Sequence, residues 1–86
     1  MEIEFDPAKD QINRAKHGIS LSAGGNVVEN AVERIADTRF EYGEQRFIAF
    51  GYLGSRLHVC VFTQRGEAVR IISVRKASQR ERVIYG

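Results

Sequence analysis

Between Arg46 and Val74 the chain reads RFIAFGYLGSRLHVCVFTQRGEAVRIISV. It contains three runs rich in β-branched and aromatic residues, which favour strands: Arg46–Tyr52, Leu57–Thr63 and Ala68–Val74. The middle run is apolar on both faces, which is typical of a central strand. Short connections at Leu53–Arg56 and Arg65–Gly66 separate the runs. Neighbouring runs with such connections predict an antiparallel meander.

Before the meander, two further strands are expected. Val32–Asp37 forms a strand, and the polar, turn-like segment Asp37–Gly43 leads from it to Arg46. Near the N-terminus, Ile3–Phe5 alternates between apolar and acidic residues and predicts a short edge strand.

Three helices complete the prediction. Asp6-Pro7 caps and opens a helix that runs from about Pro7 to His17, where Gly18 ends it. Ser20 caps a second helix to about Glu29, which we expect to be the weakest element because Gly24 and Gly25 each cost roughly 1 kcal/mol relative to alanine. The capping-box pattern Ser78-Gln-Arg-Glu81 opens a short helix to about Tyr85.

The order of these elements predicts an α+β fold in one domain of 86 residues. We expect an antiparallel sheet of four to five strands, with the two N-terminal helices packed on it and a short C-terminal helix.

Composition argues against several classes of protein. A single cysteine, Cys60, excludes an intramolecular disulfide, and His17 and His58 are too far apart in sequence for a local metal site. No apolar run reaches the 18–20 residues that a membrane span requires, and the N-terminus carries acids where a signal peptide carries bases. We therefore expect a cytoplasmic protein without a metal, a cofactor or a membrane contact.

The charge is distributed unevenly along the chain. From Arg65 onward there are six bases and two acids, which gives +4, whereas residues 1–64 hold seven bases and nine acids, which gives −2. A basic C-terminal quarter predicts a polyanionic partner such as RNA, although a solvated charged face is the simpler alternative.

Six motifs of the chain together resemble the BrnT toxin family: Phe5-Asp-Pro-Ala-Lys9, Lys16-His-Gly-Ile-Ser20, Gly43-Glu-Gln-Arg-Phe47, Thr63-Gln-Arg-Gly66, Arg70-Ile-Ile-Ser-Val-Arg-Lys-Ala77 and Arg80-Glu-Arg82 with Tyr85. The resemblance spans essentially the whole chain. It implies a RelE-like fold and a ribonuclease toxin of a type II toxin–antitoxin system that arrests translation by cleaving RNA without metal. It also implies a DNA-binding BrnA-like antitoxin, whose complex with the toxin represses the operon. The chain departs from the family pattern at Leu21-Ser-Ala-Gly-Gly25, where the family usually has acids and alanines.

Cleavage of this kind requires a group that accepts the 2′-hydroxyl proton, cations that stabilise the phosphorane, and a proton for the leaving oxygen. The expected catalytic arginines are Arg65, Arg70 and Arg75, which we expect to converge in one pocket. A regular strand would place Arg70 and Arg75 on opposite faces, and a bulge near Ser73 would change this. Pairing of an arginine with Glu44 or Glu67 is the alternative.

His17 is a candidate general base or acid, or a histidine that merely stabilises the end of its helix. Tyr85 could stack on a base or transfer a proton, or it could pack its helix onto the sheet. His58 and Cys60 are expected in the core.

Glu44 could act as a base or pair with Arg46. Further RNA contacts are expected from four residues, unless these are simply solvated: Arg46, Lys76, Arg80 and Arg82. The same basic surface could instead serve a non-catalytic module that binds nucleic acid or protein.

Overall fold

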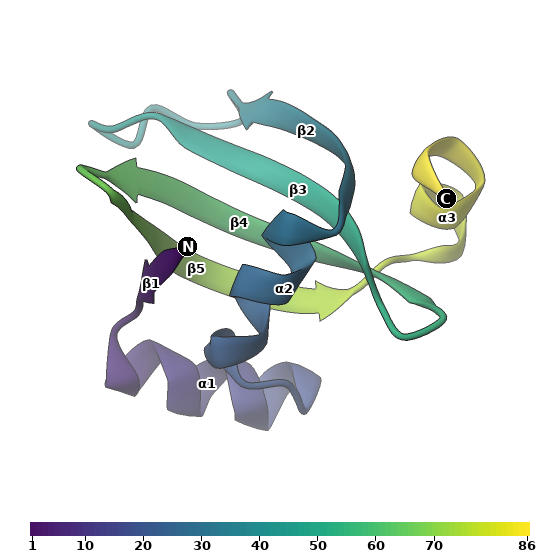
Figure 1. The fold of residues 1–86 in the computed structure, drawn as a ribbon, viewed down its shortest axis with the longest axis horizontal. Coiled ribbons are helices and arrows are strands. Elements are labelled where there is room, and N and C mark those ends of the chain that lie inside the picture. Colours follow the sequence, from purple (N-terminus) through teal and green to yellow (C-terminus); the bar gives the residue numbers. More distant parts are fainter.

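The computed structural model describes residues 1–86 and has nine elements (Figure 1). In chain order they are β1 (Glu2–Glu4), α1 (Pro7–His17), the 3₁₀ turn η1 (Leu21–Ala23), α2 (Gly24–Glu29), β2 (Ala31–Asp37), β3 (Arg46–Leu53), β4 (Arg56–Arg65), β5 (Ala68–Lys76) and α3 (Gln79–Tyr85). The α+β class and the expected order of elements are confirmed. No helix is long and apolar enough to cross a lipid bilayer.

The five strands form one sheet in the order β1-β5-β4-β3-β2. Strands β2 to β5 pair antiparallel, which confirms the meander. However, β1 pairs parallel to β5, so the expectation of a purely antiparallel sheet is wrong. A hairpin turn dictates the direction of the strand that follows it, but α1 and most of the chain separate β1 from β5, and no local signal fixes their relative direction.

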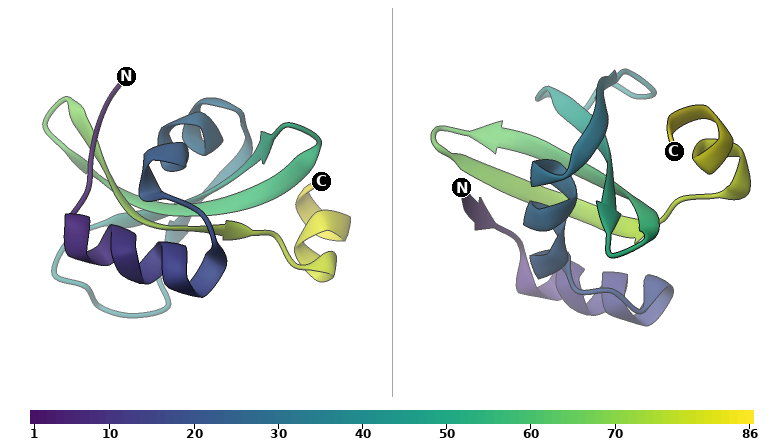
Figure 2. Two further views of the ribbon diagram at one scale, coloured as in Figure 1. Left: turned by 90° about the horizontal axis from the view of Figure 1, so that it is seen from below. Right: turned by 45° about the vertical axis from the view of Figure 1, so that its right-hand side comes forward.

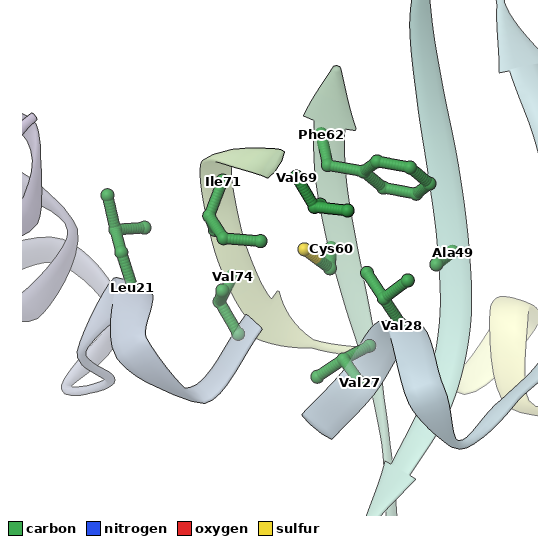
Figure 3. Packing of buried hydrophobic residues seen from close by; sticks show 9 residues of the cluster. All are labelled: Leu21, Val27, Val28, Ala49, Cys60, Phe62, Val69, Ile71 and Val74. Carbon is green, nitrogen blue, oxygen red and sulfur yellow. The ribbon is translucent and has the colours of Figure 1, made fainter. Parts of the chain in front are cut away.

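One face of the sheet packs against η1 and α2 (Figure 3). Val27 and Val28 of α2 and Leu21 of η1 are buried against side chains of β3, β4 and β5. Two glycines permit this close packing, because a Cβ at Gly24 would lie 2.6 Å from Ile71 and one at Gly51 would collide with the Val27 carbonyl oxygen. Gly24, which lowers helix propensity, therefore also allows α2 to approach the sheet, and Gly51 of β3 provides the matching space on the sheet. Cys60 lies in this core, and burial raises the pKa of its thiol to about 12.

Helix α1 lies along the edge of β5 rather than over the face of the sheet (Figure 1), so the expectation that both N-terminal helices pack on the sheet is wrong for α1. Asn13 is its only buried residue, so α1 has no apolar stripe with which to cover a sheet. The Asn13 side-chain amide donates to the Val74 carbonyl (2.9 Å) and accepts from the Val74 N–H (3.2 Å). The Asn13 amide thus takes the place of a neighbouring strand where β1 no longer pairs with β5.

Strand β5 contains a bulge at Ile72. Phe62 of β4 pairs with Ile71 and Val61 pairs with Ser73, so Ile72 has no partner across the ladder. Val69, Ile71 and Val74 consequently all face the core. Of the two alternatives given for this strand, the structure has the bulge near Ser73, and the extra residue brings Arg70 onto the same face as Ser73 and Arg75.

The second face of the sheet, here called the open face, carries Ile48, Phe50, Val59 and Val61. Helix α3 and the β2–β3 connection lie on this side, opposite α2 (Figure 2, left). The predicted capping box begins α3, since Ser78 Oγ accepts from the Glu81 N–H and the Glu81 carboxylate accepts from the Ser78 N–H. Tyr85 stacks on Phe50, with ring centroids 3.9 Å apart, and holds α3 against the sheet.

Candidate active site

A concavity of about 510 Å³ lies on the open face between α1, α3 and the β2–β3 connection. Its floor is the sheet, where Ile48, Phe50, Val59 and Val61 supply apolar side chains. Apart from Ile35 and Ile84, its other lining residues are polar or charged: Lys16, His17, Arg39, Ser73, Arg75, Arg80, Glu81 and Tyr85. The site therefore joins an apolar floor to a polar, mainly basic wall.

The charge of this lining is positive. Four permanent cations and one carboxylate, that of Glu81, line the concavity, and one of the cations, Arg39, is paired with Asp37 outside it. That carboxylate forms a two-fold hydrogen-bonded pair with Arg75, at 2.7 and 2.8 Å. The bond from Arg75 holds the pKa of Glu81 down at about 2 and raises the pKa of Arg75. Glu81 thus stays ionised, and an anion that enters the concavity meets an excess of positive charge.

Arg75 keeps free donors despite this pair. Its Nη1 donates to Glu81 and, at 3.3 Å, to the Lys76 carbonyl, and its Nη2 donates to Glu81. A guanidinium has five N–H groups, so the Nε–H and one Nη2–H on the adjacent edge remain unused. These two donors form a second fork of the kind that binds two phosphate oxygens. Glu81 therefore orients the guanidinium and leaves one edge available.

His17 is the last residue of α1 and lines the same concavity. Desolvation, with smaller contributions from Lys16 and Arg75, lowers the pKa of its imidazole. This direction is opposite to the effect of a helix C-terminus, which favours the charged form. The neutral ring predominates at pH 7 and can accept a proton.

Tyr85 has the packing role that we gave as one alternative, because its ring stacks on Phe50. It also lines the concavity from α3. His58 and Cys60 are buried, as expected, and His58 Nδ1 lies 2.8 Å from the Arg56 carbonyl oxygen.

The expected convergence of three arginines is not found, because Arg65 and Arg70 line no part of the concavity. Arg65 lies at the hairpin end of β4 and pairs with Ala68 of β5. At about 3.3 Å per residue, Ala68 lies roughly 20 Å along β5 from Arg75. Its nearest carboxylate is Glu44, at 3.6 Å. Arg70 lies 3.8 Å from Glu4 of β1. The tip of the β4–β5 hairpin, where Arg65 lies, is far from its open end, where Arg75 lies, although the two residues are close in the sequence.

The four expected RNA-binding residues are also separated. Arg80 lines the concavity, whereas Lys76 and Arg82 are exposed outside it. Arg46 lies over the Tyr42 ring at 4.1 Å, and its Nε is buried without a hydrogen-bond partner, 3.9 Å from Glu44.

Sequence reasoning missed Lys16, Arg39, Ser73 and Glu81 as lining residues. Lys16 adjoins His17 in its motif, which was an available signal. Arg39 was not detectable, because its position depends on the β2–β3 connection. There Asp37 is buried and accepts two hydrogen bonds from the Arg39 guanidinium, both at 2.8 Å, which lower the pKa of Asp37.

A larger hollow of about 730 Å³ lies within the β2–β3 connection itself. Its lining has three carboxylates, those of Asp37, Glu41 and Glu44, and one arginine. This balance disfavours a phosphate, so the smaller concavity is the better candidate site for a polyanion. No three histidine, cysteine or acidic side chains gather as metal ligands would.

Comparison with known proteins gives one family. The family model described as "Ribonuclease toxin, BrnT, of type II toxin-antitoxin system" matches residues 5–81 of the 86. A search of the curated proteins found no significant match. The matched region contains every residue of the concavity except Ile84 and Tyr85.

Proposed function

This chain belongs to the BrnT family of type II toxin–antitoxin ribonuclease toxins, and from that premise we propose that it cleaves RNA in the concavity on the open face, without a metal ion. RNA is its substrate class and an antitoxin is its partner. In this proposal the fold is RelE-like and the reacting groups are His17, Arg75 and Tyr85.

The observation that supports this site is the presence of His17 and Arg75 in one hollow. His17 is a neutral proton acceptor, and the free edge of Arg75 offers two parallel donors. Arg65 and Arg70 have no such neighbour, since the chain's other histidine, His58, is buried on β4. The concavity thus brings a proton acceptor and a guanidinium with free donors into one space.

In the proposed reaction, His17 removes the proton from the 2′-hydroxyl, and the resulting oxygen attacks the adjacent phosphorus. Arg75 stabilises the charge that develops on the phosphorane, with Lys16 and Arg80 nearby. The bond from phosphorus to the 5′-oxygen breaks, and Tyr85 on a different wall donates the proton to that oxygen. The products are a 2′,3′-cyclic phosphate and a 5′-hydroxyl, and solvent restores the protonation states of His17 and Tyr85.

Residues farther from the reacting phosphate would guide the strand. We propose that Arg80 binds a phosphate at the rim, and that Arg46, Lys76 and Arg82 make weaker contacts with more distant nucleotides. Such contacts change affinity and its dependence on salt more than they change the chemical step.

The proposal extends to the cellular role. Cleavage of RNA in the cytoplasm arrests translation, and a BrnA-like antitoxin neutralises the toxin. Operator DNA is bound only through the antitoxin in their complex. Inducible expression with and without the neighbouring reading frame, followed by mapping of RNA ends, tests this role: we expect growth arrest that the neighbouring frame relieves.

The biochemical test uses purified protein and a defined single-stranded RNA in excess EDTA. We expect fragments that end in a 2′,3′-cyclic phosphate, and we expect the His17→Ala and Arg75→Ala proteins to form them at least about 10²-fold more slowly. Arg56→Ala is the matched control, because Arg56 is exposed on the β3–β4 hairpin and lines no hollow. Salt-sensitive binding without cleavage under any condition would instead support the non-catalytic nucleic-acid-binding module.

A further inference from the structure

A second, smaller hollow of about 310 Å³ lies between α1 and β5 and shares part of its lining with the concavity. Three residues line both hollows: Lys16, His17 and Ser73. Four more line only the smaller one: Lys9, Ile12, Asn13 and Ile72. His17 therefore stands between the two spaces, and a strand that places a phosphate beside His17 can extend into the smaller hollow.

The charge of the smaller hollow suits an anion better than that of the concavity does. Lys9 and Lys16 are its cations, and no carboxylate lines it. Neither lysine forms an ion pair, since Asp10, the acid of α1, pairs with Arg14 at 3.3 Å. The Asn13 side chain offers no free N–H, because its amide nitrogen already donates to the Ile19 and Val74 carbonyls and its oxygen accepts from the Val74 N–H. The lysines are thus the free cationic donors of this space.

Two apolar side chains complete the smaller hollow. Ile12 is 65% exposed on α1, and Ile72 is the bulged residue of β5. Lys9, Ile12 and Lys16 lie three and four positions apart along α1, so they share one helical face. An apolar surface between two ammonium groups suits a nucleotide, whose base or ribose can cover the isoleucines while its phosphate meets the lysines.

We propose that this hollow is a subsite for the nucleotide next to the scissile link, with Lys9 binding its phosphate and Ile12 and Ile72 contacting its base or ribose. The inference rests on the proposed function, because it takes the bound polymer to be single-stranded RNA. Lys9 then binds substrate without reaching the reacting atoms.

The kinetic test compares a dinucleoside monophosphate, which holds only the scissile phosphate, with a pentanucleotide. We expect Lys9→Ala to raise the KM for the pentanucleotide roughly threefold to fivefold, as for an exposed charge contact. It should leave kcat unchanged and the dinucleotide kinetics within twofold of the wild type. Equal effects on both substrates, or no effect on either, would overturn the subsite. Arg56→Ala is the matched control for the loss of one positive charge.

A binding measurement separates this inference from the proposed function. A 2′-deoxy pentanucleotide has no 2′-hydroxyl and cannot be cleaved, so its affinity does not depend on catalysis. When a protein loses one phosphate contact with a single strand, the negative slope of the logarithm of the binding constant against the logarithm of the salt concentration becomes shallower by about 0.7. We expect this reduction for Lys9→Ala and a smaller affinity loss with an unchanged slope for Ile12→Ala. An unchanged slope for Lys9→Ala would refute the subsite, whereas wild-type protein that binds but never cleaves RNA would refute only the proposed function.

Discussion

The open face of the sheet has two basic ends that differ in what surrounds their arginines. At the concave end, Arg75 is fixed by Glu81 and shares a hollow with His17. At the hairpin end, Arg46, Arg65 and Arg70 lie 3.6 to 3.9 Å from Glu44 or Glu4 and line no hollow. Arginine alone therefore does not define the site. A proton acceptor and a concave surface beside the arginine do.

The largest effect should come from the group that only the concave end possesses. We expect His17→Ala to lower the rate of RNA cleavage about 10²- to 10⁴-fold, the range for loss of a general base. In the wild type, His17 can act as a base only while its imidazole is neutral. Because the pKa of His17 is lowered, the cleavage rate should rise with pH around a pKa below the ordinary histidine value of about 6.5 and then level off. A pH–rate profile of both proteins checks this; an unchanged profile in the variant would assign the base elsewhere.

The next effect contrasts one arginine from each end. Arg75→Ala should lower kcat about 10²- to 10³-fold, as for the loss of a preorganised transition-state donor. Arg70→Ala should change kcat by less than about threefold, because its neighbour is Glu4 and no proton-transfer group adjoins it. Single-turnover kinetics of the two variants, with circular dichroism to verify folding, provide the measurement. Equal losses would erase the distinction between the two ends.

A smaller effect concerns stability at the concave end. Glu81→Gln keeps a residue that suits the capping box but removes the charge pair with Arg75. We expect a loss of about 1 kcal/mol at pH 6, because Arg75 is 38% exposed and water screens the pair. Because the pKa of Glu81 is lowered to about 2, the charge pair stabilises the folded protein fully at pH values above the ordinary glutamate pKa of about 4.5. This stabilisation disappears as pH falls from about 4.5 to about 2. Urea unfolding of both proteins across that range measures the difference; a gap that persists at pH 2 would disprove this account.

The smallest effect belongs to the hairpin end. Glu4→Gln removes a carboxylate that lies 3.8 Å from Arg70 and is 43% exposed. We expect a change in the free energy of unfolding of less than about 0.5 kcal/mol, since exposed and loosely paired charges contribute little. Thermal unfolding at low and high salt checks it. A loss as large as that of Glu81→Gln would show that the pairs at the two ends are equivalent.

Most of the fold was accessible from the sequence because its signals are local. The meander follows from three β-rich runs and short turns, and the capping box at Ser78 begins α3 as predicted. The parallel direction of β1 was not accessible, since no short turn joins it to β5. The bulge in β5 could be named only as an alternative to a regular strand, because Arg-Ile-Ile-Ser-Val carries no glycine that would mark it.

The candidate site was only partly predictable for the same reason. His17, Arg75, Arg80 and Tyr85 were expected, and they line one concavity. Arg65 and Arg70 were expected with them on the strength of proximity in the sequence, but a strand separates residues by about 3.3 Å per position and a hairpin places its tip far from its ends. Arg39 was missed because the buried Asp37 determines its position.

The most direct test of where RNA binds is a nuclear magnetic resonance titration of the ¹⁵N-labelled protein with a non-cleavable 2′-deoxy-substituted oligonucleotide. We expect the largest chemical-shift changes of backbone amides around the concavity, at His17, Ser73, Arg75 and Tyr85. Shifts concentrated instead at Glu44, Arg65 and Arg70, with those around His17 unmoved, would contradict it.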